Sequence, residues 1–220
     1  MDKFIELHGD RVHGETEQVR CGLGWIGKQR FVLILHNHLS PPLLGTSPLV
    51  GGTEGGQGGN DLSIGYRKAL RMLRLAEQLK RPVLWYVENT AVAGWRPCKE
   101  TVSNLSLDLL NNINENIRTI LNLKVPIIGV FSLSASKSAL ISPNIVDHAI
   151  LLTNKRFALL LTDNDTALET SREDVEVISL DDLSSLRTRL IDKFAEISQI
   201  SSSDLISQRI DRIKAVNELL

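Results

Sequence analysis

The sequence predicts an α/β protein in which parallel strands alternate with helices. A helical pattern leads twice into a proline and then into a short apolar strand, first at Pro82 and again at Pro126. Proline disfavours helical geometry in the residue before it, so each proline ends a helix. Two successive helix-proline-strand units argue for parallel strands joined by helical crossovers.

The amino-terminal segment predicts antiparallel strands before these units. Residues 4–11 (FIELHGDR) begin with a short apolar alternation, which is typical of an edge strand or an ordered arm. Residues 18–25 and 29–35 predict two strands of a hairpin, with a glycine in the turn at residues 26–28. Residues 31–35 (FVLIL) are the more apolar run and are expected to form a central strand.

Residues 40–61 are predicted to form a glycine-rich flap. Between His36 and Asp61 lie three prolines and seven of the chain's fifteen glycines, which exclude regular structure there. Residues 51–59 (GGTEGGQGG) could instead cradle a phosphate, although they lack the Lys-Ser/Thr ending of a nucleotide loop.

Residues 65–80 predict an amphipathic helix. Tyr66, Ala69, Leu70, Leu73, Ala76 and Leu79 lie on its apolar side, and Arg67, Lys68, Arg71, Arg74 and Lys80 lie mostly on the other. The basic side is either a solvated face or a docking surface for an acidic partner or a coenzyme phosphate. Apolar residues at helical spacing predict the second helix over residues 102–120.

The carboxyl-terminal part predicts more strands and then two helices. Residues 145–152, 156–161 and 175–178 are apolar runs that predict strands. From residue 181 onward, apolar residues at helical spacing predict two helices. We therefore expect a domain at residues 1–180 and a helical appendage at residues 181–220, which packs against a partner subunit.

Composition narrows the class of protein. The formal net charge of −1 provides no general attraction to nucleic acid or to an anionic membrane. Cys21 and Cys98 are far apart and lack metal-ligand spacing, as in a reduced cytosolic protein. No apolar run reaches the roughly 18 to 20 residues that a membrane span needs, and the amino terminus has no apolar signal core. A cytoplasmic location is expected.

The loops that follow the two repeated strands define the expected site. Parallel strands end on the same side of a sheet, so the loops at residues 88–97 and 132–138 face one cleft. Glu88 and Asn89 either hydrogen-bond a substrate or cap a turn. Lys137 either binds a carboxylate or phosphate or is simply solvated.

Two other chemistries are open at this cleft. His36 and His38 share a face of one strand and could ligate a metal, but no third ligand has a recognisable spacing. Ser132, Ser134, Ser136 and Ser138, with His148 after Asp147, make a serine hydrolase imaginable. Neither a nucleophile elbow nor a triad order singles out one serine.

Several segments closely resemble the carboxyltransferase alpha subunit of bacterial acetyl-CoA carboxylase. They include FIELHGDR at residues 4–11, GYRKALR at residues 65–71, and SDL with QRIDR between residues 203 and 212. The resemblance runs nearly from end to end and implies a crotonase-like spiral of β-β-α units with C-terminal helices.

The resemblance also implies a function. That family moves a carboxyl group from carboxybiotin to acetyl-CoA, making malonyl-CoA, and works beside a beta subunit. Paired backbone N–H groups in its glycine-rich loops stabilise an enolate-like oxygen. Carried onto this sequence, the donors are the N–H groups of Ala91, Val92, Ala135 and Ser136. His36, Glu88, Asn89, Lys137 and Ser138 are then the expected substrate-binding residues.

This chain departs from the family in those loops. Ala91 or Val92 stands where the family has glycine, and residues 133–139 (LSASKSA) contain no glycine. A backbone N–H survives such a change, but a side chain obstructs the approach of a substrate carbonyl.

Three functions follow from the resemblance and its departures. The first is a divergent carboxyltransferase alpha-type subunit that acts with a beta-type partner on a coenzyme A thioester. Carboxybiotin on a partner carrier would then donate the carboxyl group, and a biotin carrier protein or an acyl carrier protein is a further possible partner. The alternatives are a catalytically inactive scaffold subunit, and an acyl-thioester decarboxylase or hydrolase on the same fold.

Overall fold

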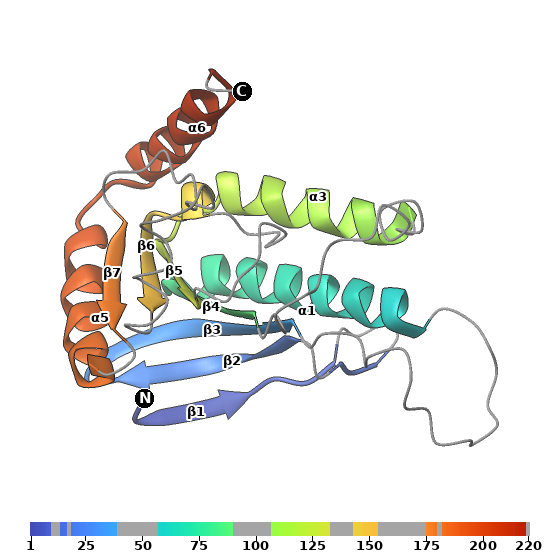
Figure 1. Ribbon diagram of the computed structural model, residues 1–220, viewed down its shortest axis with the longest axis horizontal. Helices are drawn as coiled ribbons and strands as arrows, with labels where there is room; N and C mark the ends of the chain where they lie inside the picture. Colours follow the sequence, from blue (N-terminus) through green and yellow to red (C-terminus); the bar gives the residue numbers. More distant parts are fainter. Residues whose placement is uncertain are drawn as a thin grey trace, which may run out of the picture.

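The described part of the chain is an α/β fold in which strands alternate with helices, as predicted (Figure 1). The computed structural model describes residues 1–9, 14–16, 19–38, 57–89, 107–132, 143–153, 175–179 and 182–218. The strands are β1 (Lys3–Glu6), β2 (Val19–Ile26), β3 (Gln29–His38), β4 (Val83–Asn89), β5 (Ile127–Ser132), β6 (His148–Thr153) and β7 (Glu176–Ser179). The helices are α1 (Gln57–Leu79), α3 (Leu107–Leu121), the 3₁₀ turn η1 (Pro143–Ile145), α5 (Leu183–Ile197) and α6 (Ser202–Glu218). None of the described helices is long and apolar enough to cross a membrane.

The described strands form one sheet whose order follows the chain, from β1 to β7. β1, β2 and β3 pair antiparallel, and β3 to β7 pair parallel. The predicted hairpin is confirmed, with Ile26 opposite Gln29 across the turn. Gly27 in this turn has a φ of 59°, a conformation that glycine adopts without a Cβ clash. The parallel strands predicted from the two proline-marked units are also confirmed.

The central strands are buried on both faces. Val32 and Ile34 of β3 face the core under α1, whereas Phe31 and Leu33 face the core under α5. Successive side chains of a strand point to opposite faces, so a strand covered on both sides must be apolar throughout. The ring of Phe31 stacks on that of Phe194 in α5, with centroids 5.7 Å apart.

The helix α1 begins earlier than expected. It begins at Gln57, so residues 57–61 of the predicted flap are helical, and residues 40–56 lie outside the described residues. Figure 1 shows α1 and α3 side by side over one face of the sheet. Glycine-rich composition argued against a helix at residues 57–61, but helix propensity is a weak prior that tertiary context overrides.

The two C-terminal helices were predicted, but they are not an appendage to the core. Leu190, Phe194 and Ile197 of α5 are buried against strands β2 to β7, and Leu205 of α6 joins the same cluster. The sheet has two apolar faces, and α1 and α3 cover only one of them. Residues 183–197 therefore complete the core that residues 1–180 were expected to form alone.

A buried arginine joins α6 to the rest of the fold. The Arg209 side chain is fully buried and makes a bidentate ion pair with Asp147, with Nε–Oδ1 and Nη2–Oδ2 distances of 2.7 and 2.5 Å. Arg209 also donates to the carbonyl oxygens of Ile120, Leu123 and Val125 at 2.9, 2.5 and 2.9 Å. These carbonyls lie at or just past the end of α3, where a cation is favoured by the helix dipole.

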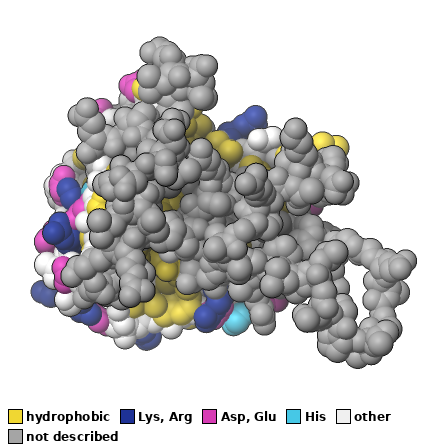
Figure 2. Space-filling model, viewed as in Figure 1, with side chains coloured by type: hydrophobic (Ala, Val, Ile, Leu, Met, Phe, Trp, Pro, Cys, Tyr) yellow, Lys and Arg dark blue, Asp and Glu magenta, His cyan; other side chains and the backbone are white. Residues whose placement is uncertain are grey.

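Charges of both signs are interspersed on the outer side of α5. Figure 2 shows mixed acidic and basic side chains along the margin where Figure 1 places α5 and β7. Arg189 pairs with Glu176, and Lys193 pairs with Glu196 at 2.7 Å. Neighbouring charges of opposite sign cancel at a distance, so this side of the protein offers no extended field of one sign.

Replacing Arg209 should strongly destabilise the protein. Arg209→Met leaves the buried Asp147 carboxylate without its bidentate partner, and breaking a buried pair costs about 3–5 kcal/mol. Urea unfolding followed by circular dichroism measures this loss. Lys214→Met is the control, because Lys214 makes only an exposed pair with Asp211 on the same helix. If the two variants were equally stable, the buried pair between Arg209 and Asp147 would not be what stabilises the fold.

Candidate functional site

The parallel strands bring His36 and the ends of β4 and β5 to one edge of the sheet. His36 pairs with Val87, and Val87 pairs with Phe131, near the carboxyl ends of β3, β4 and β5. The exits of β4 and β5 therefore lie on the same edge, as expected. In parallel α/β sheets, ligands bind outside the carboxyl ends of the strands.

Only some of the predicted site residues lie in the part of the chain that the structure describes. Glu88 and Asn89 end β4, where they pair with Asn37 and His38 of β3. Their position at this edge agrees with the sequence prediction. Several predicted residues lie outside the described part of the chain and stay predictions: Ala91, Val92, Ala135, Ser136, Lys137 and Ser138.

His36 is buried against an aromatic side chain of α1. It is 2% exposed, and its ring meets that of Tyr66 edge to face, with centroids 5.4 Å apart and an interplanar angle of 77°. The described residues thus enclose His36 almost completely, and its expected role in substrate binding stays a prediction. Tyr66 fixes the orientation of the His36 ring at the carboxyl edge.

The Tyr66 hydroxyl is buried, and no described residue hydrogen-bonds to it. Tyr66 is 1% exposed, and its oxygen has no partner in the part of the chain that the structure describes. Burial raises the pKa of the phenol far above its ordinary value, so the group stays protonated at neutral pH. Leu109 and Ile113 of α3 pack against Tyr66. A buried polar atom without a partner costs free energy.

One lysine of the predicted basic face of α1 is buried. Lys68 is 0% exposed and forms an ion pair with Glu15, whose other carboxylate oxygen accepts from the Gly9 N–H at 2.5 Å. The same oxygen is 3.2 Å from Nδ1 of His8. Placing Lys68 on the solvated side was wrong, because the segment before β2 covers it. No spacing pattern in the sequence connects Glu15 with a residue 53 positions later.

Other nucleophile and metal chemistries gain no support from the described residues. Burial raises the pKa of the Cys21 thiol to about 12, so Cys21 is a neutral thiol at physiological pH. Among the residues that the structure describes, no three or more His, Cys, Asp and Glu side chains are grouped to hold a metal ion.

Two known structures share this architecture with the chain. A Pseudomonas malonate decarboxylase hetero-tetramer in complex with malonate is 16% identical, with a TM-score of 0.52, over 89% of this chain and 78% of that one. The transcarboxylase 12S structure with methylmalonyl-coenzyme A is 10% identical, also at 0.52, over 90% of this chain and 39% of that one. These likenesses define the class of fold, which is the crotonase type of carboxyltransferases.

The sequence comparisons identify the family within that class. The family model described as acetyl co-enzyme A carboxylase carboxyltransferase-like matches residues 52–168, more than half of the chain. The acetyl-coenzyme A carboxylase carboxyl transferase subunit alpha of Streptococcus pneumoniae (strain Hungary19A-6) is 24% identical over 217 residues, which cover 93% of this chain and 77% of that protein. The chain belongs to the acetyl co-enzyme A carboxylase carboxyltransferase-like family, which confirms the resemblance drawn from its motifs.

Acid should remove the stabilisation that Glu15 provides. Burial opposes the charged form of Glu15, but hydrogen bonds from Lys68 and Gly9 outweigh it and hold the pKa below its ordinary value of 4.5. A depressed folded-state pKa gives stability that is complete above pH 4.5 and is lost as the pH falls through the folded value. Melting temperatures from pH 7 to pH 3, compared with those of Glu15→Gln, measure this loss. The difference between the two proteins should shrink in acid; a constant difference would contradict the prediction.

Removing the Tyr66 hydroxyl should stabilise the fold. Tyr66→Phe keeps the ring contact with His36 and deletes a buried oxygen that has no hydrogen-bond partner among the described residues. Burying such an unsatisfied oxygen costs about 1–3 kcal/mol, and the substitution removes this cost. Urea unfolding should therefore show a higher free energy of unfolding than for the wild type. Tyr66→Leu, which also removes the ring, is the comparison and should lower it. A destabilised Tyr66→Phe variant would show that the hydroxyl has a partner in solution.

Proposed function

We propose that this chain is a carboxyltransferase alpha-type subunit that acts with a beta-type partner on a coenzyme A thioester. One observation carries the proposal: the family match spans the segments after β4 and β5, and these strands end on the same edge of the sheet. The family relation supports the kind of chemistry, and the strand register supports this edge as its place.

The chain's own contribution is the stabilisation of negative charge. Backbone N–H groups of Ala91, Val92, Ala135 and Ser136 donate to the oxygen of the thioester as it acquires enolate character. Such donors are stronger where water is excluded, and the rings of His36 and Tyr66 are packed and buried near this edge. When bound, carboxybiotin on a partner carrier supplies the carboxyl group. Glu88, Asn89, Lys137 and Ser138 position the substrate.

Co-expression with a beta-type subunit from the same host tests the proposal. Mass photometry should show a complex that contains both chains, and the complex should transfer a carboxyl group from carboxybiotin to an acyl-CoA. If the chain stays monomeric and binds no beta-type subunit, the subunit proposal fails. Carbon dioxide released from malonyl-CoA without transfer would favour the decarboxylase alternative.

The missing glycines favour a second candidate, an inactive scaffold subunit. Residues 133–139 contain no glycine, and Ala91 or Val92 stands where the family has one. Restoring Ala135→Gly and Ser136→Gly together separates an impaired site from an abandoned one. One oxyanion donor is worth about 2.7–4 kcal/mol, or roughly 10²–10³ in rate, so an impaired site should respond measurably. An intact complex with no gain in carboxyl transfer would favour the scaffold.

A further inference from the structure

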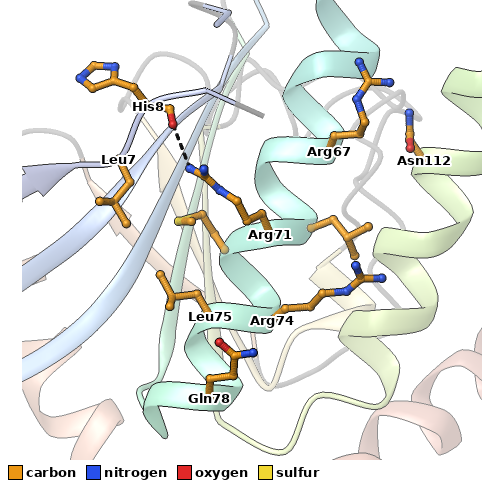
Figure 3. A pocket seen from close by; sticks show the side chains of 10 residues that line it. Leu7, His8, Arg67, Arg71, Arg74, Leu75, Gln78 and Asn112 are labelled. Atoms are coloured by element: carbon orange, nitrogen blue, oxygen red, sulfur yellow. Dashed lines mark hydrogen bonds between the residues drawn. The ribbon is translucent and has the colours of Figure 1, made fainter. Parts of the chain in front are cut away.

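A basic groove runs over the outer side of α1 (Figure 3). Its volume is about 810 Å³, within the range of roughly 300–1,000 Å³ typical of small-molecule sites. Residues from the end of β1, from α1 and from α3 line it: Leu7, His8, Arg67, Leu70, Arg71, Met72, Arg74, Leu75, Gln78 and Asn112. We call this hollow the arginine groove.

The arginine groove carries an excess of positive charge. Three of its described lining residues are arginines, and none is acidic. Arg67 pairs with Asp108 of α3 at 2.8 Å. The other two arginines have no described carboxylate partner. Arg71 makes one hydrogen bond, from Nη2 to the His8 carbonyl oxygen at 3.1 Å, and Arg74 is exposed.

Arg71 is held in place with donors to spare. A guanidinium has five N–H donors, and the bond to His8 uses one of them. Its Nε is buried and has no hydrogen-bond partner among the residues that the structure describes. A planar fork that is fixed at one nitrogen is ordered before a ligand arrives, so less side-chain entropy is lost when it binds an anion.

The three guanidinium groups are spread out along the groove. Figure 3 shows Arg67 and Arg74 on the side of α1 that faces α3, whereas Arg71 points toward His8 at the end of β1. At a rise of about 1.5 Å per residue, Arg67 and Arg74 are roughly 10 Å apart along the helix. A single small anion cannot contact all three. The leucines between them give apolar surface for an organic group.

We propose that the arginine groove binds a small organic ligand that carries at least two phosphate groups. Phosphates suit the guanidinium fork, and two phosphates on one ligand can each meet one of the two arginines that have no described carboxylate partner, Arg71 and Arg74. A concave hollow bounded by three elements fits a nucleotide-sized molecule better than it fits a flat protein surface. The groove lies on the outer side of α1, so this proposal does not depend on carboxyl transfer.

Isothermal titration calorimetry of the full chain tests the proposal. The probes are inorganic phosphate, pyrophosphate, ADP and adenosine 3′,5′-bisphosphate. The two nucleotides should bind most tightly, inorganic phosphate least, and added salt should weaken binding. Preference for adenosine 3′,5′-bisphosphate over ADP would identify the phosphate pattern found in coenzyme A as the source, and the reverse would identify a nucleoside diphosphate.

Single substitutions assign the binding to the groove. Arg71→Gln and Arg74→Gln should each weaken nucleotide binding about tenfold, the size of one lost hydrogen bond to a charged group. Arg71→Lys should fall between Arg71→Gln and the wild type, because lysine keeps the charge but loses the fork. Arg118→Gln is the matched control, since Arg118 is an exposed arginine of α3 outside the groove, and it should bind as the wild type does.

Three results would overturn the proposal. They are no binding of either nucleotide, nucleotide binding that both glutamine variants leave unchanged, and an acidic peptide that binds more tightly than the nucleotides. The third would make the groove a docking surface for an acidic protein segment. If Arg71→Gln fails to fold by circular dichroism, Arg74→Gln carries the test, because Arg74 is exposed.

Discussion

The buried ion pair between Arg209 and Asp147 is the interaction on which the described fold most depends. It connects α6 with the end of α3, and Asp147 also accepts from the Ile127 N–H at 2.8 Å, at the start of β5. Taking two charges out of water is costly unless both are well paired. Here the bidentate pair and the hydrogen bonds from Arg209 to three carbonyl oxygens offset that cost. The contact lies where β5 begins and just before β6, so it fixes the amino ends of the parallel strands.

The Arg209 contacts and the proposed site lie at opposite edges of the sheet. The Arg209 contacts lie at the amino ends of the strands, whereas His36, Glu88 and Asn89 lie at the carboxyl ends. A rigid amino edge allows the loops at the other edge to vary without loss of the fold. This separation explains how a family member can keep its sheet while its cleft loops lose their glycines.

The cationic residues of α1 perform different tasks. Lys68 is buried and neutralised by Glu15, and Arg67 ties α1 to α3 through Asp108. Arg71 and Arg74 have no described carboxylate partner and line the groove. A uniformly solvated basic face would show none of these differences, so net charge along a helix says little about what each side chain does.

Elements with a regular repeat could be predicted from the sequence. The hairpin, the parallel strands after Pro82 and Pro126, and the two C-terminal helices follow from local patterns of apolar residues and turn residues. The family could also be predicted, because short motifs such as GYRKALR at residues 65–71 can be read directly from the chain. The start of α1 was missed, since glycines weaken the local signal for a helix.

The sequence alone determined the class of fold, the family and the edge of the sheet where the site is expected, because periodicity and short motifs are local properties of the chain. Tertiary structure alone decided that α5 belongs to the core, that Lys68 is buried beside Glu15, and that Arg209 holds Asp147. Each of these depends on contacts between residues far apart in the chain, and only the folded arrangement brings such residues together.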